Sequence, residues 1–105
     1  MLPILFEVSV HNGQAYGEIY GDERFPDGTI VTTSTVLSQT DETIQTLNTL
    51  YHRATSEQED VITQHQYVME RVNELRHPSD DLLIKQLDAL HAYRRILEER
   101  IRTWK

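Results

Sequence analysis

Residues 3–20 of this chain, PILFEVSVHNGQAYGEIY, contain two runs of alternating apolar residues with a turn between them. The turn is Asn12-Gly13. This pair favours a two-residue hairpin loop, because a type I′ turn requires a positive φ at both central positions. A loop of that length sets Val10 opposite Ala15, which places small and apolar partners on one face. We therefore expect residues 3–20 to form an antiparallel β-hairpin.

The same hairpin register predicts the composition of its two faces. Phe6 would lie opposite Ile19 on the apolar face, and Glu7 would lie opposite Glu18 on the other. Like charges in that position destabilise a hairpin, so we interpret the polar face as a surface for a cationic group of a partner. Two solvated carboxylates are the simpler alternative. The candidate partner-binding residues, with the acids of the following loop, are Glu7, Tyr16, Glu18, Tyr20, Asp22, Glu23 and Asp27.

A third strand is predicted after a loop over residues 21–28. Residues 29–37, TIVTTSTVL, are rich in β-branched side chains, which favour strands. The inward face is ambiguous, since Ile30 with Val36 and Val31 with Leu37 fit equally well. Residues 1–38 are thus expected to form a three-stranded antiparallel meander.

The apolar spacing becomes helical after residue 39. It alternates between three and four residues, as in a coiled-coil seam, and a short His-Pro-Ser connection at residues 77–79 divides it. We expect an α+β fold in one cooperative domain, in which residues 39–105 form an antiparallel helical hairpin with helices over about 41–76 and 80–104. The first helix would extend beyond the second, so we also expect a homo-oligomer, a dimer or larger. The predicted oligomer seam is Ile44, Leu47, Tyr51, Gln58, Val61, His65, Val68, Leu97, Ile101 and Trp104.

Composition narrows the function. The chain has 105 residues, 17 acidic and 10 basic side chains, a net charge of -7 and no cysteine. This acidity argues against binding to a nucleic-acid backbone, and no apolar run approaches a membrane span. The first residues lack a signal-peptide pattern, so we expect a cytoplasmic protein. We find no catalytic motif or metal-ligand spacing and predict a non-enzymatic protein with no cofactor and no metal.

A second candidate site would bind an anionic nucleotide between protomers. Loop amides, hydroxyl groups and arginine side chains are suitable ligands for phosphate. The simpler interpretation is that threonine fills a strand and that Arg24 pairs with a neighbouring aspartate. The residues of this alternative site are Arg24, Thr32, Thr33, Ser34, Thr35, Arg94 and Arg95.

Residues 17–36, GEIYGDERFPDGTIVTTSTV, resemble a segment of small uncharacterised phage and prophage accessory proteins. Those proteins share an Arg-Phe-x-Asp-Gly turn followed by a Val-x-Thr-Ser strand. The resemblance implies a host cell infected by phage, in which small acidic proteins bind host machinery or sequester its signals. We therefore expect an oligomeric interaction protein that modulates or inhibits a host protein. The alternatives are the nucleotide-binding module and a virion or scaffold component.

Overall fold

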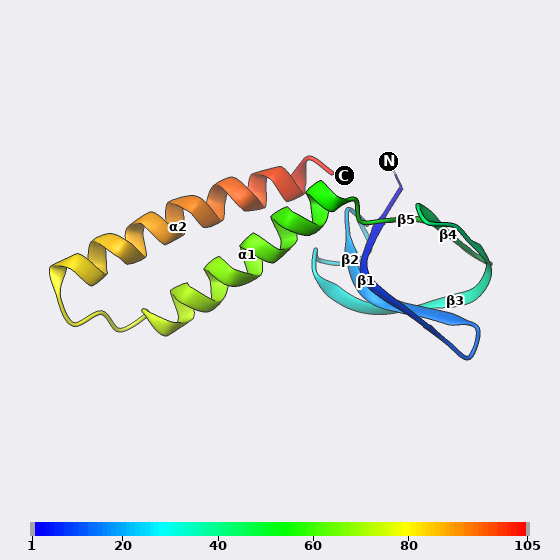
Figure 1. Cartoon of the computed structure of the whole chain (residues 1–105), viewed down its shortest axis with the longest axis horizontal. Coiled ribbons are helices and arrows are strands. Elements are labelled where there is room, and N and C mark those ends of the chain that lie inside the picture. The colour runs from blue at the N-terminus through cyan, green and yellow to red at the C-terminus, as the bar shows by residue number, and fades with distance from the viewer. Residues whose placement is uncertain (1, 105) are drawn as a thin grey trace. The chain divides into compact units, whose positions relative to one another are not determined.

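The computed structural model describes residues 2–104, which form five strands followed by two helices (Figure 1). This order confirms the α+β prediction in outline. The strands are β1 (Ile4–His11), β2 (Gln14–Tyr20), β3 (Thr29–Gln39), β4 (Thr43–Thr46) and β5 (Leu50–Arg53). The helices are α1 (Ser56–Glu74) and α2 (Asp81–Arg102).

The chain divides into two compact units. The first unit contains the five strands, the start of α1 as far as Glu59, and Trp104. The second unit contains residues 60–103, which are the rest of α1 and all of α2.

The strands of the first unit form a closed barrel in chain order, so the predicted three-stranded meander is wrong in its extent. Consecutive strands pair antiparallel, and β5 returns to pair with β1. Because five is an odd number, this closing pair is parallel. It is made by His52, whose amide donates to the carbonyl of Pro3 at 2.9 Å, and by Ala54, whose amide donates to Leu5 at 2.9 Å. Closure leaves no open sheet edge at this seam.

The barrel core corrects the predicted start of the first helix. Its buried cluster is Leu5, Ala15, Ile19, Ile44 and Tyr51. Ile44 lies in β4 and Tyr51 in β5, although the sequence pattern assigns both to a helix beginning near residue 41. That prediction is wrong because strand residues at 44 and 51 happen to continue the heptad spacing. The residue between them in the pattern, Leu47, is 64% exposed in the turn between β4 and β5.

The β1–β2 hairpin keeps the predicted turn but not the predicted register throughout. Asn12 and Gly13 have φ values of 53° and 77°, as a type I′ turn requires. The register then shifts, because Glu7 and Val8 of β1 together lie opposite Gly17 of β2. This β-bulge inserts one extra residue and exchanges the two faces of the strand.

Two predicted pairings are therefore wrong. Glu18 pairs with Phe6 rather than with Glu7, and Ile19 pairs with Leu5 rather than with Phe6. Leu5, which the sequence pattern places on the outer face, is 1% exposed in the barrel core.

A second bulge settles the ambiguous inner face of β3. Thr33 and Ser34 together lie opposite Ala15, and the Thr33 hydroxyl accepts a hydrogen bond from the Ala15 amide at 3.1 Å. Because of the extra residue, side chains after the bulge point to the opposite face from the one that simple alternation would give. As a result Val31 and Val36, five residues apart, both pack against the core, whereas their predicted companions are outside: Leu37 is 60% exposed and Ile30 is 77% exposed.

The two helices begin at side-chain caps. At the start of α1, the Gln58 amide donates to the Thr55 hydroxyl at 3.2 Å and the Thr55 amide donates to Gln58 Oε1 at 2.9 Å. This reciprocal pair is a capping box. The carboxylate of Asp80 accepts from the Leu83 amide at 2.8 Å and caps α2. The bounds of α2 match the predicted second helix within two residues.

Within the second unit, α1 and α2 run antiparallel and side by side (Figure 1). The Tyr93 hydroxyl of α2 donates to Gln64 of α1, and His65 of α1 lies 3.3 Å from Glu98 of α2. The predicted helical hairpin is thus confirmed for residues 56–102. The buried residues of these helices are Val61, Ile62, Val68, Leu97 and Ile101.

Candidate functional site

A shallow hollow on the outside of the barrel lies at the β1 bulge. Its volume is about 190 Å³, and two of the three glutamates of the predicted acidic surface, Glu7 and Glu18, line it. Glu7 is exposed and has a φ of 54°, a left-handed conformation that a non-glycine residue adopts at a cost. The bulge therefore brings Glu7 to the hollow although it no longer pairs with Glu18. The lining residues are Glu7, Ser9, Tyr16, Gly17, Glu18 and Ile30.

Burial and the charges of three carboxylates raise the pKa of the Tyr20 phenol beside this hollow. The Tyr20 hydroxyl donates to Glu18 Oε2 at 3.1 Å. Burial raises the pKa of Tyr20 well above its ordinary value. The charge of Glu18 and its hydrogen bond raise this pKa further, followed by the charges of Asp27 and Glu7. These residues therefore create a region of negative potential, which favours a cation.

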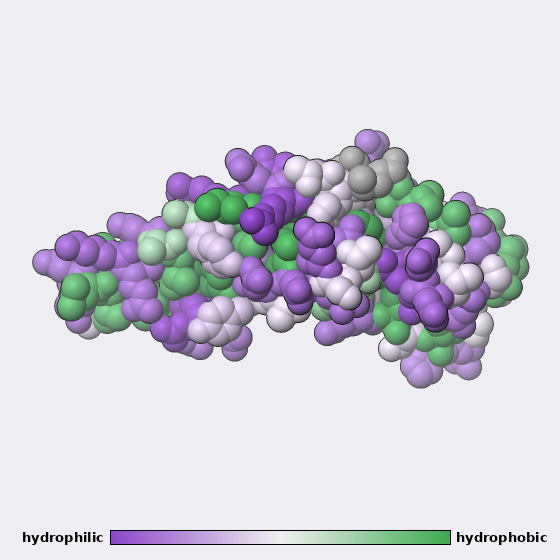
Figure 2. All heavy atoms as spheres, turned by 45° about the horizontal axis from the view of Figure 1, so that its top comes forward, coloured by the Kyte–Doolittle hydropathy of each residue, from purple (hydrophilic) through white to green (hydrophobic). Residues whose placement is uncertain are grey.

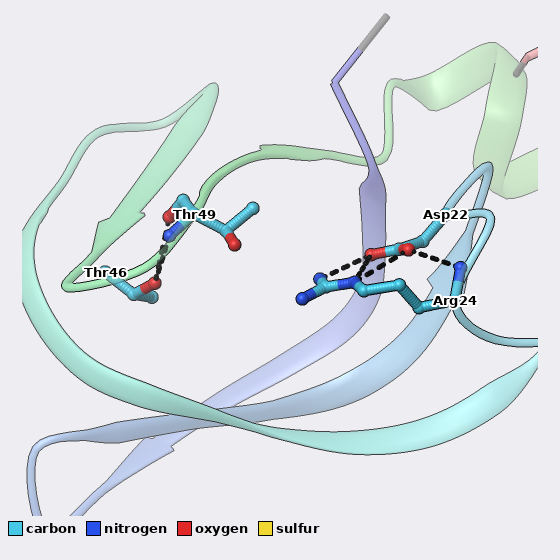
Figure 3. A network of polar contacts seen from close by, with 4 residues as sticks. All are labelled: Asp22, Arg24, Thr46 and Thr49. Atoms are coloured by element: carbon cyan, nitrogen blue, oxygen red, sulfur yellow. Dashed lines mark hydrogen bonds and ion pairs between the residues drawn. The ribbon is translucent and has the colours of Figure 1, made fainter.

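The remaining acids of the predicted surface hold the β2–β3 loop together. Asp22 is 8% exposed and accepts from the Arg24 side chain at 2.7 and 3.0 Å and from the Arg24 amide at 2.9 Å (Figure 3). These hydrogen bonds from Arg24 lower the pKa of Asp22 below its usual value. Asp27 accepts from the Gly21 amide at 2.8 Å, and Glu23 is exposed. Asp22 and Asp27 thus have clear structural roles in the loop.

The aromatic residues of the predicted surface have different surroundings. Tyr16 is half-buried at the hollow, with its ring 6.1 Å from the ring of His11. Tyr20 is 7% exposed, and its ring meets Trp104 edge-on with centroids 6.0 Å apart. Tyr16 is therefore open to a partner, whereas Tyr20 contributes its hydroxyl from a packed ring.

The residues of the alternative nucleotide site belong to the β2–β3 loop, to β3 and to α2. Arg24 follows β2 in the loop before β3, whereas Ser34 and Thr35 are five and six residues beyond Thr29, where β3 begins. Thr33 is buried and holds the β3 bulge. The others are Thr32, exposed on β3, Arg94, 3.7 Å from Glu98, and Arg95, exposed on α2.

The predicted oligomer seam lies mostly inside the single chain. Ile44 and Tyr51 belong to the barrel core, and Gln58 caps α1. Four further seam residues, Val61, Val68, Leu97 and Ile101, are already buried. His65 contacts Glu98, Trp104 contacts Tyr20, and Leu47 is exposed in a turn. Side chains that one chain already buries offer little surface to a second copy. The role of this seam in joining protomers stays a prediction.

A second hollow, of about 240 Å³, lies where β1, β5 and the start of α1 meet. Three of its four polar lining residues, all except His52, have side chains engaged within the chain. Arg53 donates to the Thr40 carbonyl and to Gln39 Oε1, while Thr55 and Gln58 form the helix cap. This hollow therefore offers fewer groups for a ligand than the one at the bulge.

Sequence reasoning missed the apolar part of the site at the bulge. Ile30 is 77% exposed at the rim, and Ser9 lies next to the hollow on β1. From the sequence pattern, Ile30 is one of two candidates for the inner face of the strand. The bulge at Thr33, which places Ile30 outside, cannot be recognised from the neighbouring residues. The exposed isoleucine adds an apolar contact to an acidic hollow.

The comparisons with known proteins give no assignment: no protein-family model, curated protein or solved structure matches the chain. Between residues 2 and 104 there is no helix long and apolar enough to cross a bilayer. Over the same range, no three His, Asp or Glu side chains are grouped so that they could hold a metal ion.

Proposed function

We propose that the barrel is a protein-interaction module whose hollow at the β1 bulge receives a lysine or arginine side chain of a host protein. The observation that carries this proposal is a hollow lined by the carboxylates of Glu7 and Glu18 and rimmed by Ile30, in which Glu18 also accepts a hydrogen bond from the Tyr20 hydroxyl. The protein acts without catalysis, by occupying a surface that its partner needs.

The chemistry of the hollow favours a cation with an apolar stem. Lysine and arginine carry a charged head on an aliphatic chain, and the chain packs on apolar surface while the head reaches polar groups. In the hollow, Ile30 and the Tyr16 ring suit the stem, and the carboxylates of Glu7 and Glu18 suit the head. Tyrosine is enriched at protein interfaces because its ring adds contact area and its hydroxyl a hydrogen bond.

The strained backbone of Glu7 supports the same site. A left-handed conformation at a non-glycine residue costs stability and is found preferentially where function requires it. The bulge uses that conformation to bring an exposed carboxylate to the hollow. The resemblance of residues 17–36 to phage and prophage proteins supports placing the partner in an infected host cell.

A photo-crosslinking experiment tests this function. A photoreactive phenylalanine analogue replaces Tyr16, and the protein is irradiated inside its producing cells. We expect crosslinks to one host protein, at positions next to a lysine or arginine. The double variant Glu7→Gln, Glu18→Gln should lower the yield at least tenfold, because hydrogen bonds to charged groups contribute about 1.5–3 kcal/mol each.

The matched control is Glu23→Gln, which removes an exposed carboxylate that does not line the hollow. It should crosslink as the parent protein does. The proposal fails if the double variant melts like the parent and still crosslinks with the same yield, or if the crosslinked positions have no basic residue near them.

A further inference from the structure

One face of α2 exposes apolar side chains that the hairpin itself does not use. Leu82, Tyr93 and Ile96 are 77%, 41% and 52% exposed. With Ala89 they are spaced seven, four and three residues apart, so they lie on one side of the helix. Tyr67, 62% exposed, is on α1. Tyr93 leans toward α1 through its hydrogen bond to Gln64, one turn before Tyr67, which places Tyr67 on this side of the hairpin too. We call these five residues the hairpin face; Figure 2 shows apolar residues at the surface in green.

Most apolar side chains of the helical hairpin stay exposed or half-buried in the single chain, and a partner on the hairpin face would cover part of them. All of its buried residues lie between Val61 and Val68 of α1 and between Leu97 and Ile101 of α2. Beyond them, toward the connection between the helices, Leu83 and the other seam residues are only half-buried. Helices in proteins owe most of their stability to tertiary packing. A second layer on the hairpin face would supply that packing.

The hairpin face is complementary to itself in an antiparallel arrangement. When two α2 helices cross with residue 91 at the centre, the small Ala89 of one copy lies opposite the large Tyr93 of the other, and the reverse. The same arrangement sets Leu82 opposite Arg100. The acidic first turn, with Asp81, then meets the basic last turn. A parallel arrangement would instead oppose Tyr93 to Tyr93 and Arg100 to Arg100.

The size of the face also suits a second copy. Two helices about 10 Å apart and about 30 Å long present roughly 600 Å². A specific protein interface buries about 800 Å² on each partner, which is of the same order.

We propose that the hairpin face binds the hairpin face of a second copy, with the two α2 helices antiparallel about a two-fold axis between Ala89 and Tyr93. This dimer uses a different surface from the seam predicted from the sequence. It does not depend on the proposed function of the barrel.

Cysteine pairing tests the register, because the chain has no cysteine of its own. Two single variants, Ala89→Cys and Tyr93→Cys, are prepared and mixed under mild oxidation. We expect a disulfide between the two variants and little within either one. Residues 89 and 93 of opposite copies face each other, whereas two copies of residue 89 are offset by about 6 Å along the helix, too far for the Cβ separation of about 3.8 Å in a disulfide.

Sedimentation of the cysteine-free protein supplies the second measurement. The parent chain should sediment as a dimer at micromolar concentration, and Leu82→Glu with Ile96→Glu should make it a monomer. The control Ile84→Glu introduces a single glutamate on the opposite side of α2, where Ile84 is 45% exposed, and should leave the dimer intact.

Three results would overturn the proposal. A monomeric parent chain means that another molecule or only solvent covers the face. A dimer that survives the Leu82 and Ile96 substitutions uses another surface. A disulfide that forms readily within Ala89→Cys alone requires a parallel arrangement or an antiparallel crossing at residue 89, and either one excludes the proposed axis between Ala89 and Tyr93.

Discussion

The carbonyl oxygen of Phe6 lies 2.9 Å from the point that a Cβ atom on Gly17 would occupy. Real Cβ atoms do not approach a backbone oxygen so closely. Phe6 is the last paired residue of β1 before the bulge, and Gly17 lies opposite the bulge on β2. Gly17 is therefore the residue that permits the bulge, and the bulge in turn presents Glu7 at the hollow.

The first prediction concerns that contact. We expect Gly17→Ala to lower the free energy of unfolding by about 2 kcal/mol, because strand backbone must move to accept the methyl group. Urea unfolding measures the change. Ser9→Ala, an exposed position on β1 beside the bulge, is the control and should change stability by less than about 0.5 kcal/mol. An unchanged midpoint for Gly17→Ala would mean that the bulge is not formed.

A second prediction uses the left-handed backbone of Glu7, whose φ is 54°. Glycine adopts this conformation freely, while alanine pays about 1 kcal/mol. Glu7→Gly should therefore be more stable than Glu7→Ala by about that amount, as measured by thermal or urea unfolding. At an ordinary strand position the order is the reverse, because glycine loses more entropy on folding. Finding alanine the more stable variant would argue for an extended Glu7.

The third prediction tests whether residues 41–55 form barrel strands or the helix that the sequence pattern predicts for them. Ile44 is 0% exposed in the barrel core, and Leu47 is 64% exposed in a turn. We expect Ile44→Ala to cost about 2–5 kcal/mol, as truncations in a packed core do. Leu47→Ala should change stability by less than about 0.5 kcal/mol. Comparable losses at the two positions would instead favour a helical seam.

Acid should weaken the Asp22–Arg24 pair. The pKa of Asp22 is lowered in the folded protein, so the pair stabilises the fold above the unfolded pKa of about 3.9. That stability is lost as the pH falls through the still lower folded pKa. The difference in melting temperature between the parent and Asp22→Asn should be full at neutral pH and shrink below about pH 4.

Arg24→Ala serves as the companion variant for this pH dependence. It leaves Asp22 in place but removes the guanidinium that lowers the Asp22 pKa. Like Asp22→Asn, Arg24→Ala should therefore be less stable than the parent at neutral pH, and this difference should shrink below about pH 4. If the parent and Asp22→Asn differ by a constant amount down to acid pH, Asp22 does not titrate as this pair requires.

The candidate site was only partly predictable. The pattern of residues 3–20 indicated an acidic face with Glu7, Tyr16 and Glu18, and the structure groups these three around one hollow. It could not indicate Ile30, whose outward position follows from the β3 bulge. The sequence did suggest that Arg24 pairs with a neighbouring aspartate, and the structure identifies that aspartate as Asp22. A bulge shifts every later side chain to the other face, yet a single inserted residue changes no local composition.

Residues close together in the chain specify the turns and helix ends of this protein. Asn12-Gly13 specified the type I′ turn, and the bounds of α2 followed from its acidic cap and seven-residue apolar spacing, because turns and helices are stabilised by residues near in sequence. The tertiary structure alone decided that residues 43–46 and 50–53 are strands. Their partners are β3 and β1, distant in the chain, and closing the barrel buries Ile44 and Tyr51 more completely than the exposed start of a helix would. β4 and β5 have only four residues each, too few for their alternation to be told from a helical spacing, so their pairing with distant strands decides their structure.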